Sequence, residues 1–308
     1  MKSLESERAR FRADLIDAGL LVPMGVDGLY GFGEQFERII EGIDTAIRRK
    51  AVEFHGARAR VLRFPPIYAR QHFELTDYIT SFPNLTGAVS SFAGDDHQHQ
   101  ALIADVEARL PWDGHLSPAG TMLVSAACHP SYSTLPKVLP ENGQLTDVYG
   151  FCYRHEPSID PARMQAFRMH EYVLVGTPQQ AISHRDAWVT KGMDILESLG
   201  LTATPVAAND PFFGRPGRLL GASQRDQGLK TELVVRLYGD LDEGTAVVSA
   251  NCHHEHFGAT FGVTTPDGEV AHSACVGFGM ERIALALLRS NGFDVAEWPS
   301  STRRALGW

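Results

Sequence analysis

The segment that most constrains the fold is residues 151–173, which read FCYRHEPSIDPARMQAFRMHEYV. It begins with an apolar run, breaks at Pro157 and Pro161, and returns as a second run that ends just after Glu171. Two β-rich runs joined by a polar loop that contains proline predict an antiparallel hairpin. The chain therefore has to build a sheet around this hairpin.

The hairpin strands are expected to present chemistry on one face. Since alternate residues of a strand share a face, Arg154 points the same way as Glu156, and Phe167 the same way as Met169 and Glu171. A guanidinium group pairs with phosphate, a carboxylate accepts from an exocyclic amine, and an aromatic ring stacks on a base. The pattern favours a nucleotide site; the alternative is a half-buried strand pair with a structural Arg–Glu ion pair.

Composition places the chain among globular proteins. It has 308 residues, of which 44% are hydrophobic and 21% charged, values that are ordinary for a soluble protein with a large core. The N-terminal region is charged and helical in pattern without an apolar signal core, and no stretch approaches the ~20 apolar residues of a membrane span. We therefore expect a cytoplasmic protein with no membrane partner.

The four cysteines, Cys128, Cys152, Cys252 and Cys275, lie far apart and form no CxxC pair. In a chain without a secretion signal, this spacing predicts free thiols or metal ligands rather than disulfides.

The net charge of −9 argues against a broad nucleic-acid-binding surface. One local basic segment stands out, residues 215–230, with Arg215, Arg218, Arg225 and Lys230.

Periodicity predicts the remaining elements. Helical patterns cover residues 3–18, 34–54, 97–110, 178–199 and 276–291. Strand patterns cover residues 59–64, stopped by Pro65-Pro66, and 232–238, 245–252 and 257–264. Successive strands without regular βαβ alternation predict an α+β fold, an antiparallel sheet flanked by helices. No linker divides the chain, so we expect a single domain over residues 1–308.

Two groups of residues have the chemistry of metal ligands. In the run from Cys252 to His256, a strand would place Cys252, His254 and His256 on one face; a polar sheet surface or substrate-facing histidines are the alternatives. The other group would join Cys128, Glu171 and Cys275 across the sheet, although their spacing alone does not establish it. Two thiolates and a carboxylate suit zinc and leave a fourth position open for substrate.

Residues 273–288, SACVGFGMERIALALL, place Gly277 and Gly279 just before a helix that bears Arg282. Glycines at a strand-to-helix turn let the backbone approach a ligand closely, and simple helix packing is the alternative.

Three blocks in order resemble the motifs of class II aminoacyl-tRNA synthetases. Pro65-Pro66 after a long helix and a strand is similar to motif 1, YRHE followed by FRMHE to motif 2, and GFGMER to motif 3. The spacing resembles the seryl-type core, and residues 249–252, SANC, resemble that family's SxSNC-like strand. We expect no coiled-coil arm of the kind with which that family grips tRNA. A truncated seryl-like core with Cys–Glu–Cys resembles the amino acid:[carrier protein] ligases.

The resemblance implies an activity. Members of that family activate glycine or alanine with ATP and transfer it to the phosphopantetheine thiol of a carrier protein rather than to tRNA. The resemblance also implies a homodimer formed through motif 1. Three rival functions stay open: a minimal aminoacyl-tRNA synthetase, a non-catalytic ligand sensor, and a zinc hydrolase built on Cys252 and the neighbouring histidines.

The resemblance also assigns roles to the motif residues. Arg154 matches the arginine that holds the α-phosphate, and Arg282 the motif 3 arginine near the γ-phosphate; both are the expected catalytic residues. Glu156 matches the acceptor for the adenine amine, and Phe167 the ring stacked on adenine. The other residues expected at ATP are Arg163, Met164, Lys230, Thr245, Ala246, Val247 and Val248.

For the amino acid, the family's zinc ligands match Cys128, Glu171 and Cys275, and the zinc takes the amino group of the substrate. Ser249 is expected beside the substrate. The family's magnesium-binding Glu aligns with Thr245, so we expect Mg²⁺ at Glu243 or Glu232 instead.

By the same analogy, the segment around Arg215, Arg218 and Arg225 docks an acidic carrier protein; a solvated charged face is the alternative.

Overall fold

The computed structural model describes residues 3–56, 59–208 and 229–308. Its centre is a seven-stranded sheet in the order β3-β7-β8-β12-β11-β10-β9. The first pair is parallel and the other pairs are antiparallel. The strands are β3 (Arg60–Leu62), β7 (Gln144–Tyr153), β8 (Ala166–Gly176), β9 (Thr204–Ala207), β10 (Lys230–Val235), β11 (Thr245–His254) and β12 (His272–Gly279). The predicted hairpin is the β7–β8 pair, and the predicted α+β class is confirmed.

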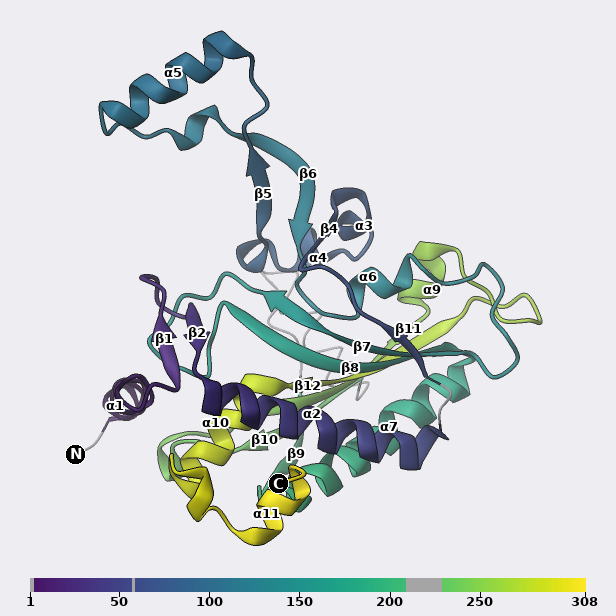
Figure 1. Ribbon diagram of the computed structural model, residues 1–308. Coiled ribbons are helices and arrows are strands. Elements are labelled where there is room, and N and C mark those ends of the chain that lie inside the picture. The colour runs from purple at the N-terminus through teal and green to yellow at the C-terminus, as the bar shows by residue number, and fades with distance from the viewer. Residues whose placement is uncertain (1–2, 57–58, 209–228) are drawn as a thin grey trace.

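Three long helices cover one face of this sheet: α2 (Glu34–His55), α7 (Pro178–Ser198) and α10 (Met280–Asn291), as Figure 1 shows. Helix α2 forms where expected because its apolar residues recur every three or four positions, and Phe36, Ile39, Ile43 and Ile47 are all buried. Helix α1 (Leu4–Asp17), the β1–β2 ribbon (Leu21–Pro23 and Tyr30–Phe32) and α11 (Ser300–Ala305) complete this layer.

The opposite face of the sheet carries shorter elements. Helices α6 (His129–Tyr132) and α9 (His256–Phe261) lie over it, with the Tyr132 and Phe257 rings stacked 3.9 Å apart. Beneath them is a second, smaller apolar cluster that contains Val148 and Val173 together with Cys128 and Cys275.

An arm projects from this second face (Figure 1). Strands β4 (Ile67–Ala69), β5 (Ala88–Ser91) and β6 (Ser117–Leu123) form a three-stranded sheet, with α3 (Arg70–Glu74) and α4 (Tyr78–Ser81) beside it. Helix α5 (Asp96–Glu107) lies at the far end of the arm, and none of its residues is buried. The arm thus adds little to either core.

Several predicted boundaries are wrong. Residues 257–264 are not a strand, because His256–Phe261 is helix α9; its Gly258 packs so tightly on Ala271 that an added Cβ would meet the Ala271 carbonyl oxygen. The helix expected over residues 276–291 begins only at Met280, since residues up to Gly279 pair as β12.

Two side-chain patterns change with these boundaries. Strand β7 ends at Tyr153, so Arg154 and Glu156 lie in the loop beyond it rather than on a strand face. Cys252, His254 and His256 do not share a strand face either, because β11 ends at His254 and His256 starts a helix. Across the described ranges, the helices are too short or too polar to cross a membrane.

Candidate active site

One rung of the sheet collects polar side chains. Val148, Glu171, Gly277, Ser249 and Glu232 pair with one another in turn across β7, β8, β12, β11 and β10. Paired residues in neighbouring strands point to the same side of a sheet. The rung therefore lies on the face opposite the long helices, and we call it the site face.

Three buried ligand-type side chains meet on the site face. Cys128 precedes α6, Glu171 lies in β8, and Cys275 lies in β12; their sulfur and carboxylate atoms are within 4.8 Å of one another. The backbone N–H of Cys128 also donates to Glu171 Oε1 at 3.2 Å. Bonds of about 2.0–2.3 Å to one zinc ion require ligand atoms at similar separations. The donor set and its spacing fit a zinc ion.

The three side chains of this cluster shift one another's pKa values. Burial raises the pKa of Glu171 to about 7. A hydrogen bond with Cys128 lowers the pKa of Cys275, while the same bond and burial raise the pKa of Cys128. Loss of the proton is thus easier for Cys275 than for Cys128, and the thiolate is the form that binds metals.

Gly277 keeps the space beside Glu171 open. A Cβ at this position would lie 2.5 Å from Met169 Cε and 3.4 Å from Glu171 Cγ. A larger residue would displace the end of the Met169 side chain, whereas its distance to Glu171 would be an ordinary van der Waals contact.

A cationic group lies next to the metal-type cluster. Arg154 donates from Nε to the Ser125 carbonyl at 3.2 Å, and its guanidinium lies 5.6 Å from the centre of the Phe167 ring. Phe167, Met169 and Glu171 alternate along β8, so the aromatic ring and the carboxylate share the site face as expected.

Arg282, which lies in α10, is a further cation of this group. Its guanidinium donates to the carbonyls of Ala162 at 2.9 Å and Ala246 at 3.0 Å. Burial, followed by the charges of Arg154 and Arg163, lowers the pKa of Arg282. Three cations whose charges act on one another form a favourable place for a polyanion such as a polyphosphate.

The remaining residues expected at ATP lie in different environments. Glu156 lies 3.7 Å from Arg163, and the ammonium of Lys230 lies 3.0 Å from the Glu232 carboxylate. The side chains of Met164, Val247 and Val248 are buried in the main apolar core, so any contact of these residues with ATP would have to come from their backbone. Thr245 and Ala246 are half-buried at the start of β11.

Of the two carboxylates expected to bind magnesium, Glu232 lies on the site face, where its charge acts on Arg282. Glu243 is exposed and precedes β11. Arg215, Arg218 and Arg225 lie outside the described residues.

Sequence reasoning missed the residues that support the site. Arg168 donates from Nε to Glu281 at 2.7 Å and from Nη1 to Glu37 at 2.6 Å, and so ties β8 to both α10 and α2. Asn251 and His253 approach Cys275. The alternation that joins Ser249 to Asn251 and His253 is the signal that would have pointed to the last two.

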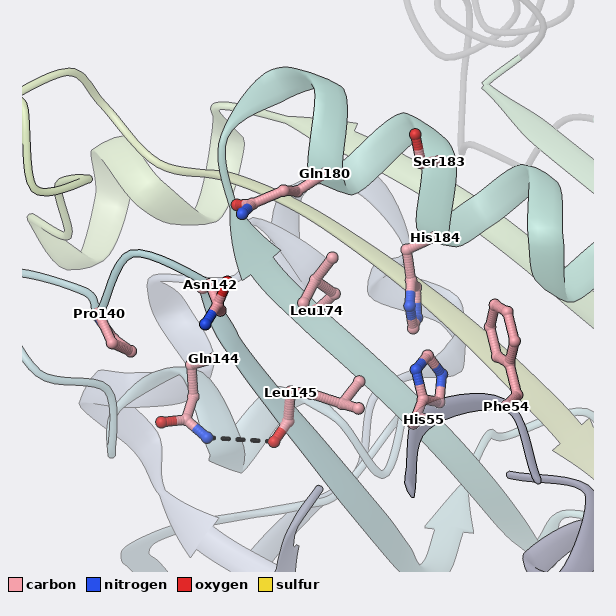
Figure 2. Close-up of a pocket in the computed structure, with 11 residues that line it drawn as sticks. Phe54, His55, Pro140, Asn142, Gln144, Leu145, Leu174, Gln180, Ser183 and His184 are labelled. Atoms are coloured by element: carbon pink, nitrogen blue, oxygen red, sulfur yellow. Dashed lines mark hydrogen bonds between the residues drawn. The ribbon is translucent and has the colours of Figure 1, made fainter. Parts of the chain in front are cut away.

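A separate hollow of about 520 Å³ opens on the helix-covered side, between the end of α2 and the start of α7 (Figure 2). His55 and His184 lie next to each other in Figure 2, with ring centroids 5.6 Å apart, and Leu145 and Leu174 also line the hollow. None of the residues that line it carries a carboxylate, an ammonium or a guanidinium group. We therefore place the chemistry on the site face.

Comparison with known proteins agrees with this geometry. No protein-family model matches the chain. Amino acid–[acyl-carrier-protein] ligase 1 of Bradyrhizobium diazoefficiens is 40% identical over 286 residues, which is 92% of this chain and 86% of that protein. Ligase 2 of the same organism is 40% identical over 295 residues, 95% of this chain. The type-2 serine–tRNA ligase of Methanopyrus kandleri is 30% identical over 201 residues, 60% of this chain and 37% of that protein.

Solved structures share the fold. M. kandleri SerRS, in complex with A. aeolicus tRNASec, superposes with a TM-score of 0.81 at 22% identity, covering 96% of this chain and 60% of that one. Prolyl-tRNA synthetase of Cryptosporidium parvum superposes with a TM-score of 0.67 at 12% identity, covering 94% of this chain and 52% of that one. The sheet and its helices are thus those of a class II aminoacyl-tRNA synthetase core. Two relatives at 40% identity over nearly the whole chain show the closer kinship: the chain belongs to the amino acid–[acyl-carrier-protein] ligase family.

Proposed function

We propose that the protein activates a small amino acid, glycine or alanine, with ATP and transfers it to the phosphopantetheine thiol of a carrier protein. The observation that carries this proposal is the meeting of Cys128, Glu171 and Cys275 on the site face, together with three arginines of the β7–β8 loop and α10 whose charges interact. Arg154 of that loop donates to Ser125, three residues before Cys128, and so links the two groups. Amine-binding and phosphate-binding chemistry then lie next to each other, as an aminoacyl-adenylate requires.

In the first step, a carboxylate oxygen of the amino acid attacks the α-phosphorus of ATP and pyrophosphate leaves. Arg154 and Arg282 stabilise the negative charge that develops on the phosphate oxygens. Their fixed hydrogen bonds to the carbonyls of Ser125 and Ala162 hold both guanidinium groups in place before the substrate arrives. Phe167 supplies the ring on which adenine stacks, and Glu156 accepts from its amine.

The amino group would be held by a zinc ion on Cys128, Glu171 and Cys275, which supplies an open coordination position for a neutral amine. Glu171 and both cysteines are buried, so this end of the proposed site is surrounded by protein walls. Such walls select a small side chain by steric exclusion. Glu232, on the same rung, is the proposed magnesium ligand.

In the second step, the pantetheine sulfur attacks the carbonyl carbon of the adenylate and AMP leaves, so that a thioester forms. The carrier is proposed as acceptor, with docking near Arg215, Arg218 and Arg225, because the relatives at 40% identity are named for a carrier protein. We propose a cytoplasmic protein that works as a single catalytic domain.

We also propose a homodimer through α2 and β3. Support comes from an apolar surface at the end of this helix and on the strand, where Val52, Phe54 and Val61 are 59%, 37% and 58% exposed. Strand β3 is also an end strand of the sheet. Light scattering of the wild type and of Val61→Asp tests this: we expect a dimer that the charge dissociates.

The test of function is ATP–pyrophosphate exchange with each amino acid, with and without a zinc chelator, followed by transfer to a pantetheinylated carrier or to tRNA. Exchange with glycine or alanine, suppressed by the chelator, and transfer to the carrier are expected. Charging of tRNA alone would favour a minimal synthetase. Absence of any exchange would favour a ligand sensor.

A further inference from the structure

Two side-chain nitrogens of the neighbouring strand β11 lie within hydrogen-bond distance of Cys275 Sγ. Asn251 Nδ2 lies 3.6 Å from Cys275 Sγ, and His253 Nε2 lies 3.7 Å from the same sulfur. These distances are typical of hydrogen bonds to a sulfur acceptor, which is larger than oxygen. The Cys275 sulfur is therefore close both to the ligand atoms of Cys128 and Glu171 and to two polar side chains of β11.

Asn251 is oriented by its own strand. It pairs with Cys275 in the β11–β12 ladder, and its Oδ1 accepts from the Ser249 hydroxyl at 3.2 Å. Because the amide oxygen is engaged there, the NH₂ group is the end that faces Cys275.

Strand β11 is irregular at His253. Cys252 pairs with Ala274 but His254 pairs with Ser273, so His253 is an extra residue in β11. His254 has a φ of +49°, in the left-handed region that few residues other than glycine adopt. Bulges of this kind redirect a side chain and are common beside active sites.

The other ring nitrogen of His253 has a polar partner of its own. Its Nδ1 lies 3.1 Å from the Ser273 hydroxyl, and Ser273 is fully buried. If that hydroxyl donates to Nδ1, the ring proton is on Nε2 and points at the Cys275 sulfur.

The net charge of a zinc-bound cluster explains what the contacts of Asn251 and His253 with Cys275 would do. Zn²⁺ on two thiolates and a carboxylate would carry a net negative charge in a buried place, which weakens the attraction for an amine. N–H groups that donate to a ligating atom take up part of its charge and fix its position.

Resting on the zinc site of the proposed function, we propose that Asn251 and His253 are positioning residues for Cys275. Their N–H groups hold its sulfur in place and draw off part of its negative charge. Zinc is thereby retained while it stays electrophilic enough to bind the amino group of the substrate. Ser249 and Ser273 orient these two side chains.

The experiment compares His253→Ala, Asn251→Ala and the double variant with the wild type. Zinc affinity is measured by competition with a chromophoric chelator, and the cobalt-substituted proteins are examined by absorption. Each single variant is expected to bind zinc about 10–100-fold more weakly. The thiolate-to-cobalt band should move to lower energy, since a sulfur with fewer hydrogen bonds gives up electrons more easily. The KM for the amino acid should rise more than the KM for ATP.

Two further variants separate this role from a merely structural one. His253→Gln keeps an N–H donor on a side chain of similar reach and is expected to restore most of the zinc affinity. His254→Asn is the matched control, since asparagine tolerates the left-handed backbone and His254 faces His272 instead. The melting temperatures of the metal-free proteins establish that each variant folds.

Unchanged zinc affinity and cobalt spectra in the double variant would overturn the proposal. Loss of zinc by His253→Ala as complete as that of Cys275→Ser would also overturn it, because the histidine would then be a ligand. If the wild type bound neither metal, the zinc site itself would be wrong. Pyrophosphate exchange by the wild type tests the ligase function separately.

Discussion

The same strands form both faces of the seven-stranded sheet, but the two faces have different roles. The rung of Glu171, Gly277 and Ser249 belongs to the site face. The adjacent rung, one residue along, pairs Tyr172 with Val276 and Val276 with Ala250, and these are buried in the main core. Because side chains alternate along a strand, neighbouring residues serve chemistry and packing independently.

Substitutions on the two faces should affect different properties of the protein. On the helix-covered face, Trp188 of α7 is fully buried; its ring is stacked on Tyr172 with centroids 4.9 Å apart and meets Phe278 edge-on at 5.8 Å. On the site face, polar groups are held by hydrogen bonds to carbonyls and to one another. We therefore expect changes on the helix face to act on stability and changes on the site face to act on binding and rate.

The largest expected effect is on the site face. Replacing Cys128 and Cys275 together by serine should abolish zinc binding and reduce amino-acid-dependent pyrophosphate exchange about 1000-fold, since a bound metal contributes several kcal/mol of binding and orientation. Metal analysis and exchange rates measure this. Cys252→Ala is the control and should retain zinc. Zinc kept by the double variant but lost with His254→Ala and His256→Ala would instead favour the hydrolase built on the histidines.

On the helix face, Trp188→Ala should lower the free energy of unfolding by about 3–5 kcal/mol, because it leaves a large cavity between α7 and the sheet. Urea unfolding measures this, with zinc affinity per folded molecule unchanged. Trp112→Ala on the arm, where the side chain is 49% exposed, is the control, with an expected change below about 0.5 kcal/mol. A small effect at Trp188 would contradict the division between the faces.

Arg154→Ala should slow pyrophosphate exchange about 100–1000-fold, because a guanidinium that stabilises developing charge is lost. Its unfolding free energy should fall by only about 1 kcal/mol, the worth of the hydrogen bond to Ser125. Arg70→Ala, which removes an exposed ion pair with Glu74, is the control. A stability loss at Arg154 as large as that at Trp188 would mean that this arginine is structural.

The smallest effect is a pH dependence on the helix face. Burial lowers the pKa of His184 to about 3 from its usual 6.5, and His184 Nε2 lies 3.1 Å from the Tyr172 carbonyl. Between these values the unfolded chain binds one more proton than the folded chain, so stability falls as pH falls. His184→Gln keeps the donor without the charge. Its stability should therefore fall less than that of the wild type between pH ~7 and pH ~5. His99 is exposed on the arm, so the His99→Gln variant should lose as much stability as the wild type over the same pH range.

The local sequence pattern predicted an element correctly where the residues of that element alone determine it. Helix α2 is confirmed nearly to the residue, and the β7–β8 hairpin is confirmed in type although β7 ends before Arg154, because apolar spacing and breaking prolines act within one segment. The same reasoning failed at residues 257–264, where α9 forms because Gly258 lets a helix press onto β12. It also missed the first half of the 273–288 segment, whose strand pairs with two distant partners.

The sequence by itself determined the residue types and their alternation: cysteines and a glutamate fit for zinc, arginines fit for phosphate, and Phe167 with Glu171 on one strand face. Only the tertiary structure decided that Cys128, Glu171 and Cys275 meet, that Met164 is in the core, and that Asn251 and His253 face a sulfur. The physical reason is range. Alternation is a property of one strand, whereas the order and register of strands depend on hydrogen bonds between segments far apart in the chain.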